Sequence, residues 1–291
     1  MIGVILALVS AAGYGVSDFV GGIASRRVAA LRVVIVSYPV ALLLLTVLAF
    51  FVGGHVTGPA VWWGLLCGFC QAFGVWWFYA ALGSGPISVV SPLTAILVAG
   101  VPVGFGVLMG ERPGPVALAG IAVALVAVVL VSRGVADEPL ARRESNPDED
   151  VTEHRFTTKV AWLTLGSGLA FGLNFVVIDQ APHEAGLWPL VFARVAASVM
   201  VVLIALAARQ LKVPTGVPLR LAISAGVLDT VANVAMLWAL QNSLLSLTGV
   251  LISLYPAGTV ALALLVLKEK VTRWQVVGMV AALAAVAMIA T

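Results

Sequence analysis

Long apolar segments separated by short polar stretches run along the whole chain of 291 residues. Ten of these segments approach or exceed the roughly 20 residues that a helix needs to span the hydrocarbon core of a bilayer. They are residues 2–22, 33–53, 60–82, 87–109, 114–132, 160–180, 187–208, 219–240, 245–267 and 272–290. The pattern therefore predicts an all-α integral membrane protein with ten transmembrane helices.

One connection between these segments differs from the others. Residues 133–159 are charged, poor in apolar residues and contain two prolines. This composition favours a flexible linker without a packed core. It divides the chain into a first five-helix repeat at residues 1–132 and a second at residues 160–291.

The two halves resemble each other in sequence. Residues 81–130 align without a gap on residues 239–288, at a shift of 158 positions, with 12 identities in 50. Glu111 then falls on Glu269, and Gly120 on Gly278. The first helices match too, since YGVS at 14–17 resembles FGLN at 171–174. We interpret the chain as an internal duplication.

Composition and charge agree with a membrane protein and indicate its orientation. The chain is 62% hydrophobic and only 10% charged, against about 25% charged in soluble domains. Fourteen of the sixteen Lys and Arg residues fall in loops on one side of the ten-helix topology. The positive-inside rule places that side, with the linker, in the cytoplasm and both termini outside the inner membrane.

An odd number of helices in each repeat makes the halves insert upside down relative to each other. Inverted repeats of this kind are typical of secondary transporters, whose substrate site lies near the bilayer midplane where the repeats meet. Ionisable residues inside membrane helices are costly and mark such sites. Three qualify here, namely Asp18, Arg194 and Asp229.

Asp229 is the strongest candidate of the three. It lies eleven residues into its predicted helix, which is about 16 Å from the helix start and near the midplane. Its repeat equivalent is Gln71, and Asn233 lies one turn further on the same face. Asp229 thus either lines a central cavity, where it carries a proton or contacts a cationic substrate, or is protonated and bonds the backbone of a neighbouring helix.

The other candidates are open in the same way. Asp18 either contributes to the site or pairs near the interface with Arg26 or Arg27, and Arg194 either extends toward the outer face or meets a carboxylate in the cavity. Aromatic residues at 76–79 favour a cavity wall, to which at most one of Trp76 and Trp77 contributes. The full set of substrate or coupling candidates is Asp229, Gln71, Asn233, Arg194, Asp18, Asn174, Trp77 and Tyr79.

The sequence carries little that favours enzyme chemistry. It has no nucleotide-binding loop, no metal-ligand cluster and no histidine near an acid at catalytic spacing, so we expect no cofactor, no metal and no nucleic-acid partner. The one alternative of this class is a membrane thiol-redox enzyme that uses Cys67 and Cys70. Without a second thiol pair, buried structural cysteines explain this motif more simply. A scaffold that signals through the linker is a further alternative.

The chain has ten predicted helices in two repeats and the stretch LYPAGTVALALLVLKEKVTRWQVVGM at 254–279. In both features it resembles the EamA family of the drug/metabolite transporter superfamily. Pro256, Glu269 and Gly278 carry the resemblance. The first half departs from the pattern, because Val98 stands in place of the proline and Ser37 in place of the arginine at 194. We interpret Glu111 and Glu269 as structural caps at helix ends.

The resemblance implies an alternating-access exporter of small metabolites, amino acid-like or otherwise polar or amphipathic, with proton coupling as an option. The alternatives within transport are efflux of lipophilic cations and solute uptake. The expected partners of the protein are a small-molecule substrate, the lipid bilayer and protons. We expect it to be a monomer or a homodimer.

Overall fold

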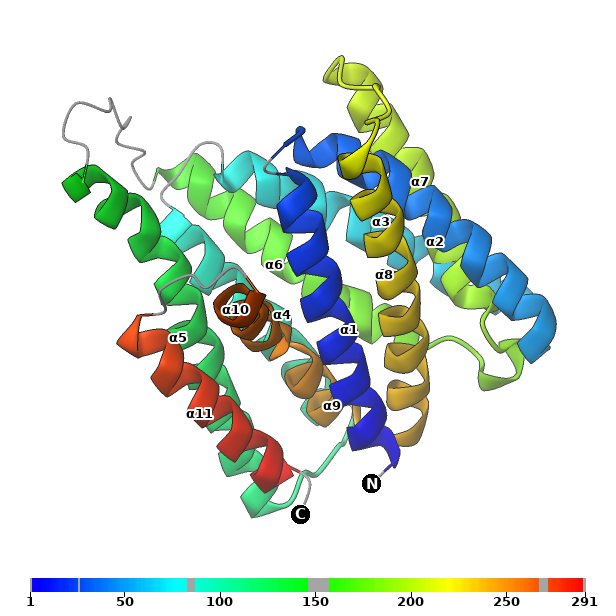
Figure 1. Cartoon of the computed structure of the whole chain (residues 1–291). Helices are drawn as coiled ribbons and strands as arrows, with labels where there is room; N and C mark the ends of the chain where they lie inside the picture. The colour runs from blue at the N-terminus through cyan, green and yellow to red at the C-terminus, as the bar shows by residue number, and fades with distance from the viewer. Residues whose placement is uncertain (1, 26, 83–86, 146–156, 267–271, 290–291) are drawn as a thin grey trace.

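A computed structural model describes the backbone of residues 2–25, 27–82, 87–145, 157–266 and 272–289, and within this part of the chain every regular element is a helix. An all-helical chain suits a bilayer, because helices satisfy their own backbone hydrogen bonds. The elements, shown in Figure 1, are α1 Ile2–Ser25, α2 Ala30–Val52, α3 Gly58–Leu82, α4 Ile87–Leu108, α5 Pro115–Ser145, α6 Thr158–Asp179, η1 His183–Ala185, α7 Trp188–Ala207, α8 Val217–Asn242, α9 Leu245–Ile252, α10 Tyr255–Val266 and α11 Arg273–Ile289.

Six of these helices are long and apolar enough to cross a membrane, namely α1, α2, α3, α6, α7 and α8. Ile96–Leu108, Pro115–Leu130 and Arg273–Ile289 are further apolar stretches that are shorter. The chain is therefore a multi-pass membrane protein, while ten complete spans remain a prediction. The start of α1 and the end of α11 lie at one end of the bundle, and the end of α5 and the start of α6 at the other (Figure 1).

The ninth predicted span is not one continuous helix. The segment predicted at 245–267 consists of α9, a turn at Ser253 and Leu254, and α10. Pro256, at the start of α10, has no backbone N–H to donate to the preceding turn, and this loss commonly kinks or interrupts a helix. The sequence pattern missed the break because apolar residues continue on both sides of it.

The helix α5 extends into the segment predicted as a linker. The helix α5 does not end near residue 132 but continues to Ser145, so the first part of the segment read as flexible is helical. Residues 146–156 and Glu269 lie outside the described part of the chain.

The helices pack in pairs that relate the two halves. In one pair α1 packs against α8, and in the other α6, the counterpart of α1, packs against α3, the counterpart of α8. Likewise α2 packs on α8 and α7 on α3. We call the first two contacts the α1–α8 interface and the α3–α6 interface. They have the arrangement expected if each repeat supplies the same helices to a shared bundle.

Equivalent hydrogen bonds hold these two interfaces together. The hydroxyl of Ser10 donates to the carbonyl oxygen of Ala232 at 2.8 Å, and the hydroxyl of Ser167 donates to that of Gly74 at 2.9 Å. Ser167 follows Ser10 by 157 positions and Ala232 follows Gly74 by 158, so the two bonds are repeat copies of each other. Both serines are fully buried. The structure thus carries the duplication seen in the sequence.

Glycines allow direct backbone contact at equivalent places where α8 packs on α2 and where α3 packs on α7. A Cβ on Gly226 of α8 would lie 2.6 Å from the carbonyl oxygen of Ser37 in α2, and one on Gly68 of α3 would collide with the carbonyl oxygen of Ala193 in α7. Gly226 and Gly68 are 158 positions apart. Small residues at these positions allow the close helix approach that membrane proteins use in place of a hydrophobic driving force.

The cap interpretation of Glu111 is confirmed. Its carboxylate accepts hydrogen bonds from the backbone N–H groups of Leu245 at 2.6 Å and Ser246 at 3.0 Å. These groups belong to the first turn of α9, where backbone donors have no partner within the helix. Glu111 follows α4 in the first repeat, so its carboxylate joins the first half of the chain to the broken helix of the second half.

Candidate functional site

An ion pair between two membrane helices forms the centre of the candidate site. The guanidinium of Arg194 on α7 pairs with the carboxylate of Asp229 on α8. The Arg194 side chain is 3% exposed, and that of Asp229 is 20% exposed. Of the two alternatives for Arg194, the structure therefore shows the contact with a carboxylate, and the partner of Asp229 is this side chain rather than a backbone group.

The helix α2 contributes to the pair although it carries neither charge. It packs against both α7 and α8. The guanidinium carbon of Arg194 lies over the ring of Tyr38, at 4.6 Å from the ring centroid. An aromatic face attracts a cation through its quadrupole. Arg194 is thus held from two sides, by the carboxylate of Asp229 and by the ring of Tyr38.

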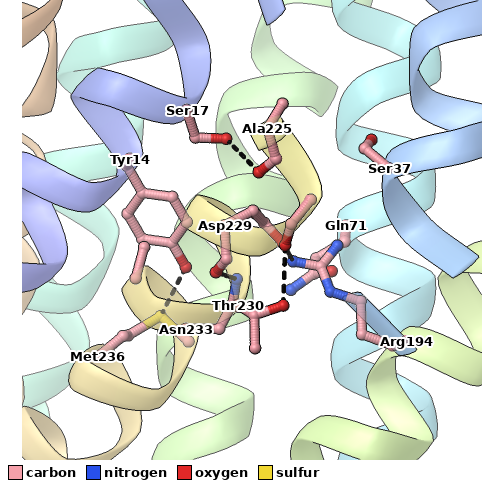
Figure 2. A network of polar contacts seen from close by, with 12 residues as sticks. Tyr14, Ser17, Ser37, Gln71, Arg194, Ala225, Asp229, Thr230, Asn233 and Met236 are labelled. Atoms are coloured by element: carbon pink, nitrogen blue, oxygen red, sulfur yellow. Dashed lines mark hydrogen bonds and ion pairs between the residues drawn. The ribbon is translucent and has the colours of Figure 1, made fainter. Parts of the chain in front are cut away.

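Gln71 lies beside this ion pair, as the repeat relation predicts for the counterpart of Asp229. Figure 2 shows the side chains of Gln71, Arg194 and Asp229 facing one another from α3, α7 and α8. The Oε1 of Gln71 and the Nε of Arg194 are buried and have no hydrogen-bond partner in the described part of the chain. Buried polar atoms without a partner are uncommon, so this is a place where a ligand or water would complete the hydrogen bonding.

The two asparagines predicted for the site form hydrogen bonds within a helix or between two helices. The side-chain N–H of Asn233 donates to the backbone carbonyl of Asp229 at 2.7 Å, one turn earlier in α8. Asn174 on α6 accepts a hydrogen bond of 2.8 Å from the thiol of Cys67 on α3. Cys67 and Cys70 are both free thiols, and this bond gives Cys67 a place in helix packing.

Asp18 lies about one helical turn from the level of the ion pair. Its neighbour Ser17 donates to the carbonyl oxygen of Ala225 on α8 at 2.9 Å, which fixes this turn of α1 against α8. The side chain of Asp18 is exposed. Among the described residues it forms no ion pair, and the interfacial alternative with Arg26 falls on a residue outside them.

The aromatic candidates do not gather at the ion pair. The ring of Trp77 packs on α6, where a Cβ on Gly166 would lie 2.8 Å from it, and it also contacts the tilted ring of Phe73, with ring centroids 5.4 Å apart. Trp76 is 46% exposed. The side chain of Tyr79 lies outside the described part of the structure.

Three tyrosines near the charges were missed by sequence reasoning. Besides Tyr38, they are Tyr14 on α1, whose hydroxyl donates to the sulfur of Met236 at 3.5 Å, and Tyr255 on α10, whose ring lies edge to face with that of Tyr14 at 6.4 Å. Tyr14 precedes Asp18 by one turn of α1. The repeat relation could have pointed to Tyr14, because it aligns Tyr14 with Phe171 and so shows a hydroxyl group that is present in one half only.

Comparison with known proteins identifies relatives of the whole bundle. A family model described as the EamA-like transporter family matches residues 1–133 and 158–291. A solved structure described only as "Crystal structure of protein" is 14% identical, with a TM-score of 0.74 over 99% of this chain and 96% of the other. No curated protein matches the chain. At that identity the solved structure supports the fold alone.

Proposed function

Because the chain belongs to the EamA-like transporter family, within the drug/metabolite transporter superfamily, we propose that it is a secondary-active exporter of small polar or amphipathic metabolites. The single observation that carries this proposal is the ion pair of Arg194 and Asp229. It lies in the middle of membrane helices contributed by a duplicated bundle, where transporters of this architecture bind their substrates.

The pair suits a binding site better than a purely structural role. Two charges inside a membrane bundle are costly to bury and contribute little net stability. They are therefore typical of a substrate or ion pathway. The accessible fraction of Asp229, and the unpartnered atoms of Gln71 and Arg194, support a site that a solute completes.

Coupling to protons and the outward direction belong to the same proposal. A carboxylate within a membrane bundle can exchange a proton with each side as the cavity opens alternately. The outward direction rests on the family resemblance. Efflux of lipophilic cations is the second candidate, and the ring contacts of Tyr14 with Tyr255 and of Tyr38 with Arg194 favour it.

The test is untargeted metabolomics of cells and medium. Wild type is compared with Asp229→Asn and with the double variant Arg194→Gln/Asp229→Asn at matched protein level. The double variant is needed because Asp229→Asn alone leaves Arg194 without its carboxylate. We expect a solute to accumulate outside cells with wild type and with neither variant.

Three outcomes would contradict the proposal in different ways. A solute exported equally by wild type and the folded double variant would make the ion pair structural. No solute difference in either compartment would argue against export altogether. Accumulation inside the cells would instead indicate uptake. A double Cys67→Ser/Cys70→Ser variant with full transport would remove the thiol-redox alternative.

A further inference from the structure

The charges inside the bundle do not balance. Asp229 has a partner in Arg194, so that pair is neutral as a unit. Asp18 is the other acid predicted within the membrane helices, and in the described part of the chain no cation pairs with it. With both carboxylates ionised, the three side chains carry one net negative charge. An unmatched charge in a membrane bundle calls for a counterion.

Asp18 faces the interior of the bundle at a place that a solute can reach. Its side chain is exposed, yet Asp18 lies on the face of α1 that carries the buried residues Ala7 and Ala11. Ser17 contacts Ala225 of α8, and Gly226, the next residue of α8, packs against the backbone of Ser37 in α2. The turn of α1 that carries Asp18 and the turn of α2 that carries Tyr38 therefore flank α8 at one level of the bundle. The helix α10 also approaches α1 closely, since a Cβ on Gly258 would lie 3.8 Å from the Cα of Gly15.

The groups around Asp18 are aromatic. Tyr14 lies one turn before it on the same face of α1, and Tyr255 packs edge to face on Tyr14. Tyr38 already holds the guanidinium of Arg194 on its ring, so the ring is used as a cation-binding surface in this protein. Carboxylates and aromatic faces together are the usual surroundings of organic ammonium ligands.

We propose that Asp18, with Tyr14, Tyr38 and Tyr255, forms a binding subsite for the ammonium group of a monovalent organic amine, separate from the Arg194–Asp229 ion pair. This inference rests on the proposed transport function and names the substrate class. The amine supplies the missing positive charge, and its apolar body contacts the tyrosine rings. An organic anion of the same shape adds a second negative charge and is excluded.

The subsite lies on one side of the ion pair. Ser17 contacts Ala225, and Asp229 follows Ala225 by four residues, about 6 Å further along α8. Because α1 and α8 run antiparallel, Asp18 lies between Asp229 and the end of the bundle that carries the end of α5 (Figure 1). The predicted orientation makes this the cytoplasmic end, where an exported amine would arrive first.

The experiment is isothermal titration calorimetry of the purified full chain with three probes that share one ring and differ in charge. Phenethylamine is a cation, phenylalanine a zwitterion and 3-phenylpropionate an anion at pH 7. We expect phenethylamine to bind most tightly and 3-phenylpropionate not to bind. Asp18→Asn should weaken phenethylamine binding by about tenfold or more, since a charge-assisted contact is lost.

Controls separate a lost charge from a lost fold. Asp18→Glu retains the carboxylate and should keep most of the affinity, while Asp179→Asn, an acid at the end of α6, should bind as wild type does. Phenylalanine or 3-phenylpropionate binding as tightly as phenethylamine would overturn the assigned ligand class. Unchanged phenethylamine affinity in Asp18→Asn would overturn the assigned subsite.

The outcome is distinguishable from failure of the proposed function. If wild-type cells export a solute but the purified protein does not bind phenethylamine, the subsite is wrong and export stands. If phenethylamine binds through Asp18 but no solute moves in cells, the subsite stands and the export function is wrong.

Discussion

At the α1–α8 interface the hydroxyl of Tyr14 contacts Met236, whereas at the same level of the α3–α6 interface Phe171 packs on Phe78 with ring centroids 6.3 Å apart. The pattern continues along the helices. Ser17 bonds Ala225 in one interface, and Asn174 bonds Cys67 in the other. At offsets of 157 or 158 positions these are equivalent contacts, so the two interfaces share one packing scheme.

Charge is what distinguishes them. The repeat equivalents of Asp18, Arg194 and Asp229 are Phe175, Ser37 and Gln71, and all three are neutral. The contacts that build the bundle are therefore present twice, and the charged groups occur once. The difference indicates that helix packing tolerates either version, and it agrees with the proposal that the charged residues serve a ligand rather than the fold.

The largest effect should come from the acid of the ion pair. Asp229→Asn leaves a guanidinium that is 3% exposed without its carboxylate, and breaking a buried pair in this way costs about 3–5 kcal/mol. Gln71→Ala, at the neutral equivalent, should cost much less. Thermal unfolding of the purified variants in detergent measures both. Adding Arg194→Gln to Asp229→Asn should recover most of the lost stability. A Gln71→Ala variant that unfolds at a lower temperature than Asp229→Asn would contradict the proposed difference between the two interfaces.

The shared packing scheme predicts similar costs at Gly68 and Gly226. Alanine at either position would drive a methyl group into the backbone of the neighbouring helix, and overpacking of this kind costs about 1–3 kcal/mol. Gly104→Ala is the matched control, because nothing lies within 4 Å of a Cβ there. Unfolding temperatures lowered in only one of the two glycine variants would show that the interfaces are not equivalent in packing.

The cap at Glu111 should have an intermediate effect. Glu111→Gln removes the negative charge and one of the two acceptor oxygens that bind Leu245 and Ser246. Loss of a helix cap costs about 1 kcal/mol. The exposed acid Glu184 provides the control variant Glu184→Gln. Hydrogen exchange of the α9 amides gives the local readout, and unchanged protection of Leu245 and Ser246 would contradict the cap.

The smallest effects should be equal in the two interfaces. Ser10→Ala and Ser167→Ala each remove one buried hydrogen bond to a helix carbonyl, for about 0.5–1.5 kcal/mol. Both variants should unfold at nearly the same temperature. A clear difference between them would mean that the ion pair or Asp18 contributes to the packing of the α1–α8 side after all.

Apolar segment length predicted the membrane class and most helix positions, such as α2 at Ala30–Val52 for the expected 33–53. It could not predict the break before α10, since hydrophobicity is unchanged there, or the extension of α5 into a polar segment. The contact of Arg194 with Asp229 was beyond it as well, because α2 packs between their helices and only the folded arrangement brings the two charges together.

The position of Gln71 beside Asp229 was within reach of sequence reasoning, because the repeat relation assigns both to the same level of the bundle. The repeat relation marks Tyr14 through its alignment with Phe171, but tyrosines in apolar helices do not by themselves indicate a role. Their role depends on which helix face meets which neighbour, and periodicity alone does not supply that.

The ion pair also bears on how the chain enters the bilayer during synthesis. Arg194 is carried by α7, which is more apolar than α8, the helix that carries Asp229. An acid or arginine at a helix centre opposes insertion by about 2.5–3.5 kcal/mol, which α7 can offset through its own apolar residues more readily than α8 can. We expect α8 to partition fully into lipid only after α7 is in place and its guanidinium is available. The order of the helices along the chain would then also be their order of insertion, because α7 supplies the guanidinium that pairs with the acid of α8.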